Sequence, residues 1–286
     1  MNSYIVRNSD GIYTVYFENN CIYTRKFVAE SWSEPKAIAS DAYKNFSLIR
    51  SCEGEPLILY FDKCKNLFIG SSDKPHKMVL RASSEMQSTL QIDGILNGSS
   101  LRLFYSRQTL GEKYITEQHR REDGSWSAPL TLDTYIPENN LTKIINIENN
   151  YILFYSKKVP EQQIGYREIS SNNISEFKLI YSSGYKINDY SLAVTEDEIH
   201  IAAVVSTFRT NKLIYVKKNS SGISKANTLY EGPVKLCHIS IQNSKIIIVF
   251  STPKGNSRII SFDMGASFKR AENTEAFILS KAEFTD

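Results

Sequence analysis

Tyr151-Ile152-Leu153-Phe154-Tyr155-Ser156 is one of six short apolar stretches that recur along the chain with a similar ending. The last apolar residues of the six stretches are Phe17, Phe61, Tyr105, Tyr155, Val205 and Phe250. They follow one another at intervals of 44, 44, 50, 50 and 45 residues, and the last four precede a serine (Ser106, Ser156, Ser206 and Ser251). Self-similarity at a period of this length is typical of repeat architectures. The 286 residues therefore predict six units with almost nothing left over.

Each unit holds four strand-like pieces. In the second unit they are residues 47–50, 56–61, 66–70 and 77–82, and in the fourth they are 143–147, 151–155, 164–169 and 177–181. Short runs rich in β-branched and aromatic residues, separated by Gly, Asn, Asp and Ser, are typical of antiparallel strands. Four strands repeated about every 47 residues are the signature of a propeller blade. We predict an all-β fold, a single six-bladed β-propeller domain over residues 1–286 with four antiparallel strands per blade. We expect the apolar tail Phe277-Ile278-Leu279-Ser280 to pair with the first blade and close the ring.

Composition and motifs exclude several classes of protein. The chain is 41% hydrophobic with a formal net charge of +3, which suits an ordinary globular core and does not by itself call for a nucleic-acid partner. No apolar stretch is long enough to span a membrane and no secretory leader is visible, so we expect a cytoplasmic protein. The four cysteines and four histidines lack the spacing of metal ligands, and no phosphate-binding loop occurs. We therefore expect no metal and no cofactor.

The stretch Ser261-Phe262-Asp263-Met264-Gly265-Ala266-Ser267-Phe268 resembles the Asp-box, the S-x-D-x-G-x-x-W/F turn of sialidase-like (BNR-repeat) propellers. In such a turn Gly adopts a left-handed conformation, Asp accepts backbone N–H bonds and the aromatic residue packs into the blade. The resemblance implies a structural role for Ser261, Asp263, Gly265 and Phe268. Imperfect copies run from Ser71 to Met78 and from Ser170 to Phe177, and Trp32 and Trp126 are expected in the aromatic position in blades one and three.

The start of the chain is also similar to the opening strands of sialidases, through Tyr4 to Asp10-Gly11 and the strand that follows. The similarity places Met1-Asn2-Ser3 on the Arg-Ile-Pro triplet that carries a catalytic arginine in that family. The arginine is absent, and only Arg7 and Arg50 occupy positions equivalent to each other. The clamp of three arginines that sialidases use is therefore not found, and the resemblance implies the fold without the catalytic residues.

Charges differ between the two sets of turns. The connections between second and third strands carry ten basic residues against four acidic ones, whereas those between first and second strands are mainly acidic. We expect the basic set to form a ring around the ligand-facing mouth of the propeller, and it supplies the candidate ligand-binding residues Arg107, Lys157, Lys158, Arg209, Lys212, Lys254 and Arg258. Solvated lysines that keep strand edges soluble would give the same pattern.

These observations favour a non-catalytic binding or scaffold propeller that recognises an anionic glycan, a polyanion or an acidic protein surface on the basic face. A carbohydrate-binding, lectin-like propeller is one alternative, with pockets between blades. A divergent sialidase-like or five-bladed-type glycoside hydrolase is another, and it would need carboxylates in the central funnel. Asp41, Asp133 and Asp189 precede first strands and could serve there, although Asp is also common in solvated turns. The oligomeric state is left open.

Overall fold

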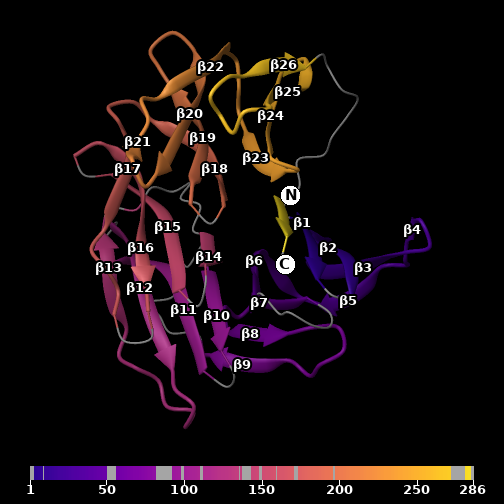
Figure 1. The fold of residues 1–286 in the computed structure, drawn as a ribbon. Helices are drawn as coiled ribbons and strands as arrows, with labels where there is room; N and C mark the ends of the chain where they lie inside the picture. The colour runs from indigo at the N-terminus through magenta and orange to yellow at the C-terminus, as the bar shows by residue number, and fades with distance from the viewer. Residues whose placement is uncertain are drawn as a thin grey trace. The chain divides into compact units, whose positions relative to one another are not determined.

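The computed structural model describes residues 3–8, 10–49, 56–81, 92–97, 100–109, 112–134, 136, 143–147, 150–158, 160–170, 173–195, 197–271 and 281–284. Within these ranges the regular structure consists of β-strands in six separate sheets (Figure 1). The prediction of an all-β, six-bladed propeller with antiparallel four-stranded blades is confirmed. The described part of the chain contains no helix of the length and apolarity needed to cross a membrane.

Residue contacts divide the chain into two units, residues 1–136 with 280–286, and residues 137–279. The first unit holds three blades. Blade 1 is built from β1 (Ser3–Asn8), β2 (Gly11–Glu18), β3 (Cys21–Val28), β4 (Ser31–Trp32), β5 (Lys36–Ala39) and β27 (Lys281–Phe284). Blade 2 is built from β6 (Ala42–Ile49), β7 (Leu57–Asp62), β8 (Leu67–Gly70) and β9 (Lys77–Leu80). Blade 3 is built from β10 (Ile92–Asn97), β11 (Ser100–Thr109), β12 (Glu112–Arg120) and β13 (Leu130–Thr134).

The second unit holds the other three blades. Blade 4 is built from β14 (Lys143–Ile147), β15 (Asn150–Lys158), β16 (Gln162–Ile169) and β17 (Lys178–Ser183). Blade 5 is built from β18 (Ile187–Val194), β19 (Ile199–Ser206), β20 (Asn211–Asn219), β21 (Gly222–Ile223) and β22 (Asn227–Gly232). Blade 6 is built from β23 (Cys237–Gln242), β24 (Lys245–Thr252), β25 (Gly255–Ser261) and β26 (Lys269–Ala271).

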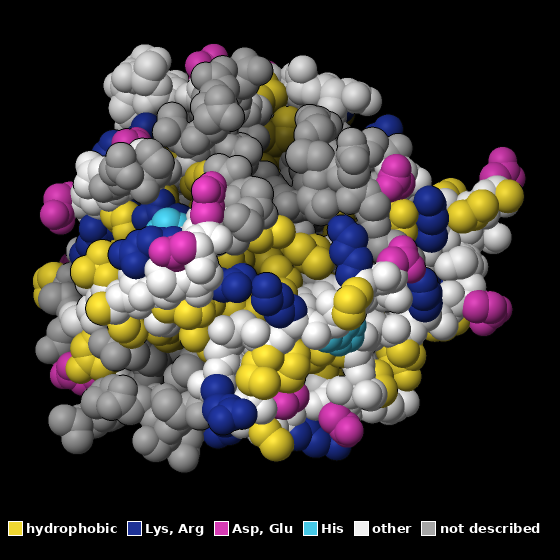
Figure 2. Space-filling view, turned by 90° about the horizontal axis from the view of Figure 1, so that it is seen from below, with side chains coloured by type: hydrophobic (Ala, Val, Ile, Leu, Met, Phe, Trp, Pro, Cys, Tyr) yellow, Lys and Arg dark blue, Asp and Glu magenta, His cyan; other side chains and the backbone are white. Residues whose placement is uncertain are grey.

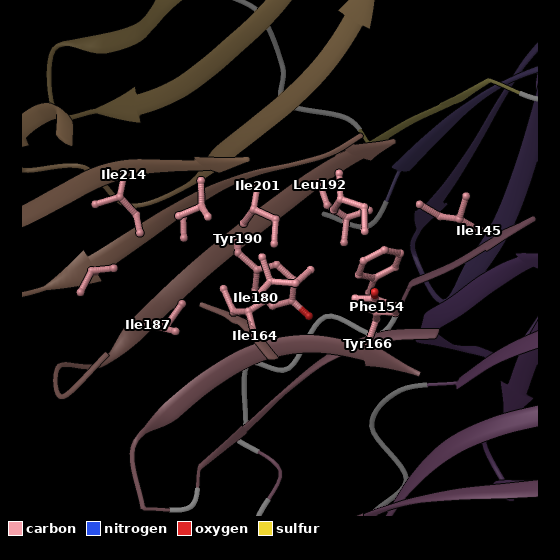
Figure 3. Packing of buried hydrophobic residues seen from close by; sticks show 14 residues of the cluster. Ile145, Phe154, Ile164, Tyr166, Ile180, Ile187, Tyr190, Leu192, Ile201 and Ile214 are labelled. Carbon is pink, nitrogen blue, oxygen red and sulfur yellow. The ribbon is translucent and has the colours of Figure 1, made fainter. Parts of the chain in front are cut away.

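Neighbouring blades within each unit share their cores. Successive side chains of a strand point to opposite faces, so a buried second strand contacts the blade before it and the blade after it. In β19, Ile201 and Ala203 pack against blade 4, whereas Ala202 and Val204 pack against blade 6. Figure 3 shows the first of these clusters, in which Phe154 and Tyr166 of blade 4 lie close to Tyr190 and Leu192 of blade 5. This two-sided burial explains why the repeated apolar stretches are almost continuously hydrophobic.

The passage from third to fourth strand repeats in four blades. In each, an apolar residue precedes a serine whose N–H and hydroxyl both bond the backbone of one third-strand residue. The four dipeptides are Trp32-Ser33, Trp126-Ser127, Ile174-Ser175 and Ile223-Ser224. The serine N–H donates to a carbonyl at 2.7–2.9 Å, and its hydroxyl accepts the N–H of the same residue. Trp32 and Trp126 each precede the serine of this passage, and their equivalence to the aromatic residue of an Asp-box stays a prediction.

A parallel pairing joins the C-terminal strand to the first blade. In β27, residues 281–284 pair with residues 4–7 of β1. The predicted tail, Phe277 to Ser280, lies outside the described residues, and the pairing is made by the four residues that follow it.

Candidate ligand-binding surface

The Asp-box-like turn of blade 6 is held by its own side chains. The Ser261 hydroxyl accepts the N–H of Gly265 at 2.7 Å, and the Asp263 carboxylate accepts both the N–H and the hydroxyl of Ser267 at 2.8 and 2.5 Å. Because these bonds favour the charged form, they lower the pKa of Asp263 to about 2. Gly265 has φ +89°, and Phe268 meets the Tyr215 ring edge-on at 4.7 Å. The four predicted residues are thus brought together in a structural turn.

A polar cluster lies beneath this turn, on blade 5. Fully buried His200 contacts the Tyr215 hydroxyl through Nδ1 at 2.7 Å, and its Nε2 lies 3.3 Å from Glu198. Lys217 contacts Glu198 at 2.6 Å and donates to the carbonyl of Met264 at 3.3 Å. Burial lowers the pKa of His200 and raises that of Tyr215. The cluster directs its polar atoms at one another and at blade 6, so it serves as a bridge between blades.

The opposite end of the same blades is built differently. In blade 5 the turn between second and third strands is braced by Thr207, whose N–H and hydroxyl both donate to the Thr210 carbonyl at 2.8 and 2.7 Å. Below it the Ser206 hydroxyl accepts from Asn188 at 2.6 Å and donates to Asn211 at 2.8 Å. The turn is therefore rigid, although its outer side chains are free of these bonds.

Blade 6 repeats this turn. The sequences Ser206-Thr207-Phe208-Arg209-Thr210-Asn211 and Ser251-Thr252-Pro253-Lys254-Gly255-Asn256 share the pattern S-T-x-R/K-x-N. The Thr252 hydroxyl donates to the Gly255 carbonyl at 2.9 Å, as Thr207 does in blade 5. In both blades the serine N–H bonds the preceding connection, at Lys186 or Leu236. The repeat places Arg209 and Lys254 at equivalent, exposed positions.

An exposed aromatic pair stands on the blade 5 turn. Phe208 is 95% exposed and Tyr185, from the connection that leads into β18, is 44% exposed. Their ring centroids lie 5.5 Å apart and the rings are nearly perpendicular, at 86°. Nothing in the sequence pattern had singled them out, because they come from two different connections. The two rings together present an aromatic surface to solvent at this end of blade 5.

The structure separates the predicted basic residues into groups. Lys158, Arg209 and Lys254 are exposed, and none of them forms an ion pair with an acidic residue of the described ranges. Lys157 lies over the Phe177 ring at 4.0 Å, and Lys212 pairs with Glu231 at 3.3 Å.

Only Arg209 and Lys254 lie on turns between second and third strands. The other five predicted residues lie in strands, which corrects their assignment to connections: Arg107 in β11, Lys157 and Lys158 at the end of β15, Lys212 in β20 and Arg258 in β25. Arg258 lies within β25 with its Nε atom buried, so its assignment to a connection was wrong. Arg107 lies at the end of β11, and its side chain is outside the described part of the chain. Their part in ligand binding stays a prediction. On the face seen in Figure 2, Lys and Arg side chains are interspersed with hydrophobic ones.

The corresponding turn of blade 2 is neutralised. The Lys63 ammonium lies 2.5 Å from the Asp41 carboxylate, which raises the pKa of Lys63. The Asp62 carboxylate, at the start of the same turn, accepts hydrogen bonds from the backbone N–H and the side-chain amide of Asn66. The basic character expected of all the turns is therefore reduced in blade 2.

The three candidate funnel carboxylates have separate structural positions. Asp41 is an exposed turn residue with φ +56°, and Asp133 lies in β13, a fourth strand. Asp189 lies in the first strand β18, where it accepts the N–H of Cys237 at 2.8 Å. Among the described residues no group of three or more His, Cys, Asp and Glu side chains is arranged to hold a metal ion.

The chain shares its fold with fucose-binding lectins. Solved structures that resemble it include the Aleuria aurantia lectin in complex with α-methyl-L-fucoside, at 12% identity, TM-score 0.54, covering 94% of this chain and 93% of that one. The SapL1 lectin in complex with α-methyl fucoside matches at 8% identity and TM-score 0.60, covering 94% of each chain. A Mycobacterium tuberculosis puromycin-hydrolysing peptidase matches at 10% identity and TM-score 0.60, over 98% of this chain and 46% of that one. No family model and no curated protein matches the sequence. The likeness to solved lectins supports the propeller fold and does not single out the sialidase family suggested by the turn motif.

Proposed function

We propose that this protein is a carbohydrate-binding, lectin-like propeller whose binding surface includes the second-to-third-strand turn of blade 5. The observation that carries the proposal is the Tyr185–Phe208 pair, exposed on a turn braced by hydrogen bonds. A flat aromatic ring offers an apolar face to the C–H groups of a sugar ring, and rigid presentation limits the entropy lost on binding. Arg209, beside Phe208, adds hydrogen-bond donors for hydroxyl or acidic groups.

The likeness to lectins that carry fucosides in their solved structures supports carbohydrate over a protein ligand. The exposed cations favour acidic glycans within that class, because a desolvated Arg or Lys gains most from an anionic partner. A protein partner would use the same aromatic and Arg residues, since both are enriched at binding hot spots. An array of neutral and acidic glycans, probed at low and at physiological salt, distinguishes these ligands.

Replacing Phe208 by Ala tests the site. Covering a Phe side chain is worth about 1.5–3 kcal/mol, so we expect F208A to weaken glycan binding by about tenfold or more, measured by titration calorimetry. Phe262, 59% exposed on the Asp-box-like turn at the opposite end, offers the matched control F262A, which should bind like the wild type. Equal binding by F208A and the wild type would remove blade 5 from the proposed site.

A further inference from the structure

Five exposed cations follow one another along the second unit. They alternate between the ends of second strands or the turns that follow them and the blade-to-blade connections: Lys158 at the end of β15 in blade 4, Lys186 between blades 4 and 5, Arg209 on the blade 5 turn, Lys235 between blades 5 and 6, and Lys254 on the blade 6 turn. We call these five residues the cationic track. None of the five forms an ion pair with an acidic residue in the described part of the chain.

The turns and connections of the track lie at one end of their sheets. In blade 5, Gly232 at the end of the last strand pairs with Asn211 at the start of the third, next to the turn. In blade 4, Ser183 pairs with Gln162 in the same way. The backbone bonds of Ser206 to Lys186 and of Ser251 to Leu236 tie each turn to the connection before it.

Acidic residues are few at this end of the second unit. Glu161 accepts a hydrogen bond from Ser182, and Glu231 pairs with Lys212, which is not part of the track. The same end of the first unit is mixed, with Glu18, Asp41 and Asp62 beside Lys63 and Lys65. The track is thus a local feature of blades 4 to 6 and not a property of every turn.

We infer that the ligand of this surface is a linear acidic polysaccharide that runs along blades 4, 5 and 6, and this inference rests on the carbohydrate-binding function proposed above. Cations repeated on three consecutive blades match a ligand that repeats its negative charge, such as a chain of uronate or sulfated sugars. The Tyr185–Phe208 pair lies on the middle blade and packs one sugar ring of the chain. A single terminal sugar would engage one blade and leave the other cations unused.

Chain length is the variable that tests the inference. Oligogalacturonates of two, four and eight residues are titrated into the full-length protein by calorimetry, with neutral dextran, dextran sulfate and polyphosphate as further ligands. Sites engaged together raise affinity without new contacts, so we expect binding to tighten by about tenfold or more between the shortest and longest oligomers. Galacturonate and dextran sulfate distinguish a carboxylate from a sulfate as the charged group.

A double variant and its control locate the effect. R209A/K254A removes two charges from the track and should weaken binding of the octamer by about tenfold or more while affecting the dimer less. K225A/K245A removes two charges from the opposite ends of blades 5 and 6 and should bind like the wild type. Three results would each overturn the inference. The first is that neutral dextran binds as tightly as the acidic chains, and the second is that affinity does not increase with chain length. The third is that polyphosphate binds equally well and that the F208A substitution leaves its binding unchanged. Length-independent, Phe208-dependent binding of a neutral sugar would leave the proposed function intact, whereas absence of all carbohydrate binding would remove both.

Discussion

The two ends of blades 5 and 6 are made by the same strands and have opposite character. At one end lies the polar cluster of His200, Tyr215, Glu198 and Lys217. It is covered by the blade 6 turn, in which Gly265 packs directly against the Tyr215 ring. At the other end, Thr207 bonds only its own turn, and the neighbouring Phe208 is almost fully exposed.

The contrast indicates that the two ends of these blades contribute differently to folding stability. We call the end that holds His200 the closed end and the end that holds Thr207 the open end. At the closed end, His200 bonds Tyr215, and Lys217 bonds both Glu198 and the Met264 carbonyl of blade 6, so removing one of these groups leaves a partner without its bond. Hydrogen bonds at the open end stiffen the backbone of the turn and leave Phe208 and Arg209 to the solvent. We therefore expect substitutions at the closed end to change folding stability and substitutions at the open end to change binding.

The largest effect is expected for Gly265→Ala. A Cβ at this position would come 2.0 Å from the Tyr215 hydroxyl, and the residue has φ +89°. Strain and overpacking together should lower the free energy of unfolding by about 3 kcal/mol or more, measured by urea unfolding. Gly222→Ala is the control, because Gly222 also has a positive φ, +129°, but no atom within 4 Å of an added Cβ. Equal losses in the two variants would show that the contact with Tyr215 is unimportant.

Acid should weaken the closed end by way of His200. Burial lowers the pKa of this histidine in the folded state, with Glu198 opposing the shift and Lys217 adding to it. Tyr215 and Asp263 also face the cluster from β20 and from the blade 6 turn. The His200 side chain therefore binds a proton more readily in the unfolded chain than in the folded one. The stability that comes from burying the neutral imidazole is fully present above the unfolded pKa of about 6.5 and declines as the pH falls through that value.

Urea unfolding of the wild type and of H200Q at pH 7.5, 6.5 and 5.5 measures this contribution. The wild type should lose more stability on acidification than the variant. A variant that parallels the wild type across the three pH values would assign the acid sensitivity to other groups.

The smallest effect is expected for Arg209→Ala on stability. Arg209 is exposed, and its neighbours in the turn are held by Thr207 and not by the guanidinium. The free energy of unfolding should stay within about 0.5 kcal/mol of the wild type. A larger loss in the same urea titration would mean that the open end also supports the fold, and the separation of the two ends would fail.

Much of the fold could be predicted from the sequence, because each blade repeats a local pattern. The pieces expected in blades 2 and 4 overlap the observed strands, and the hydrogen bonds of the Asp263 turn are specified by neighbouring residues. The split fourth strands of blades 1 and 5 were not anticipated, although the recurring apolar-Ser dipeptides carry that signal.

The candidate site was only partly predictable. The basic residues were visible, but the pairing of Lys63 with Asp41 and the burial of Arg258 depend on contacts distant in sequence. Tyr185 and Phe208 meet across two connections, which no local pattern reports. Aligning residues 206–211 with 251–256 would have revealed the shared turn, since its Thr and Asn residues recur with the serine.

The pairing of β27 with β1 has a consequence for synthesis of the chain. Blade 5 is complete once Gly232 follows Ile187, within a single short stretch, whereas blade 1 needs residues 281–284 beside residues 4–7 (Figure 1). Residues 281–284 are synthesised only after every other blade has been translated, and until then one edge of β1 has no paired strand. Unpaired strand edges invite association with other chains. The first blade to be translated is the last to be finished.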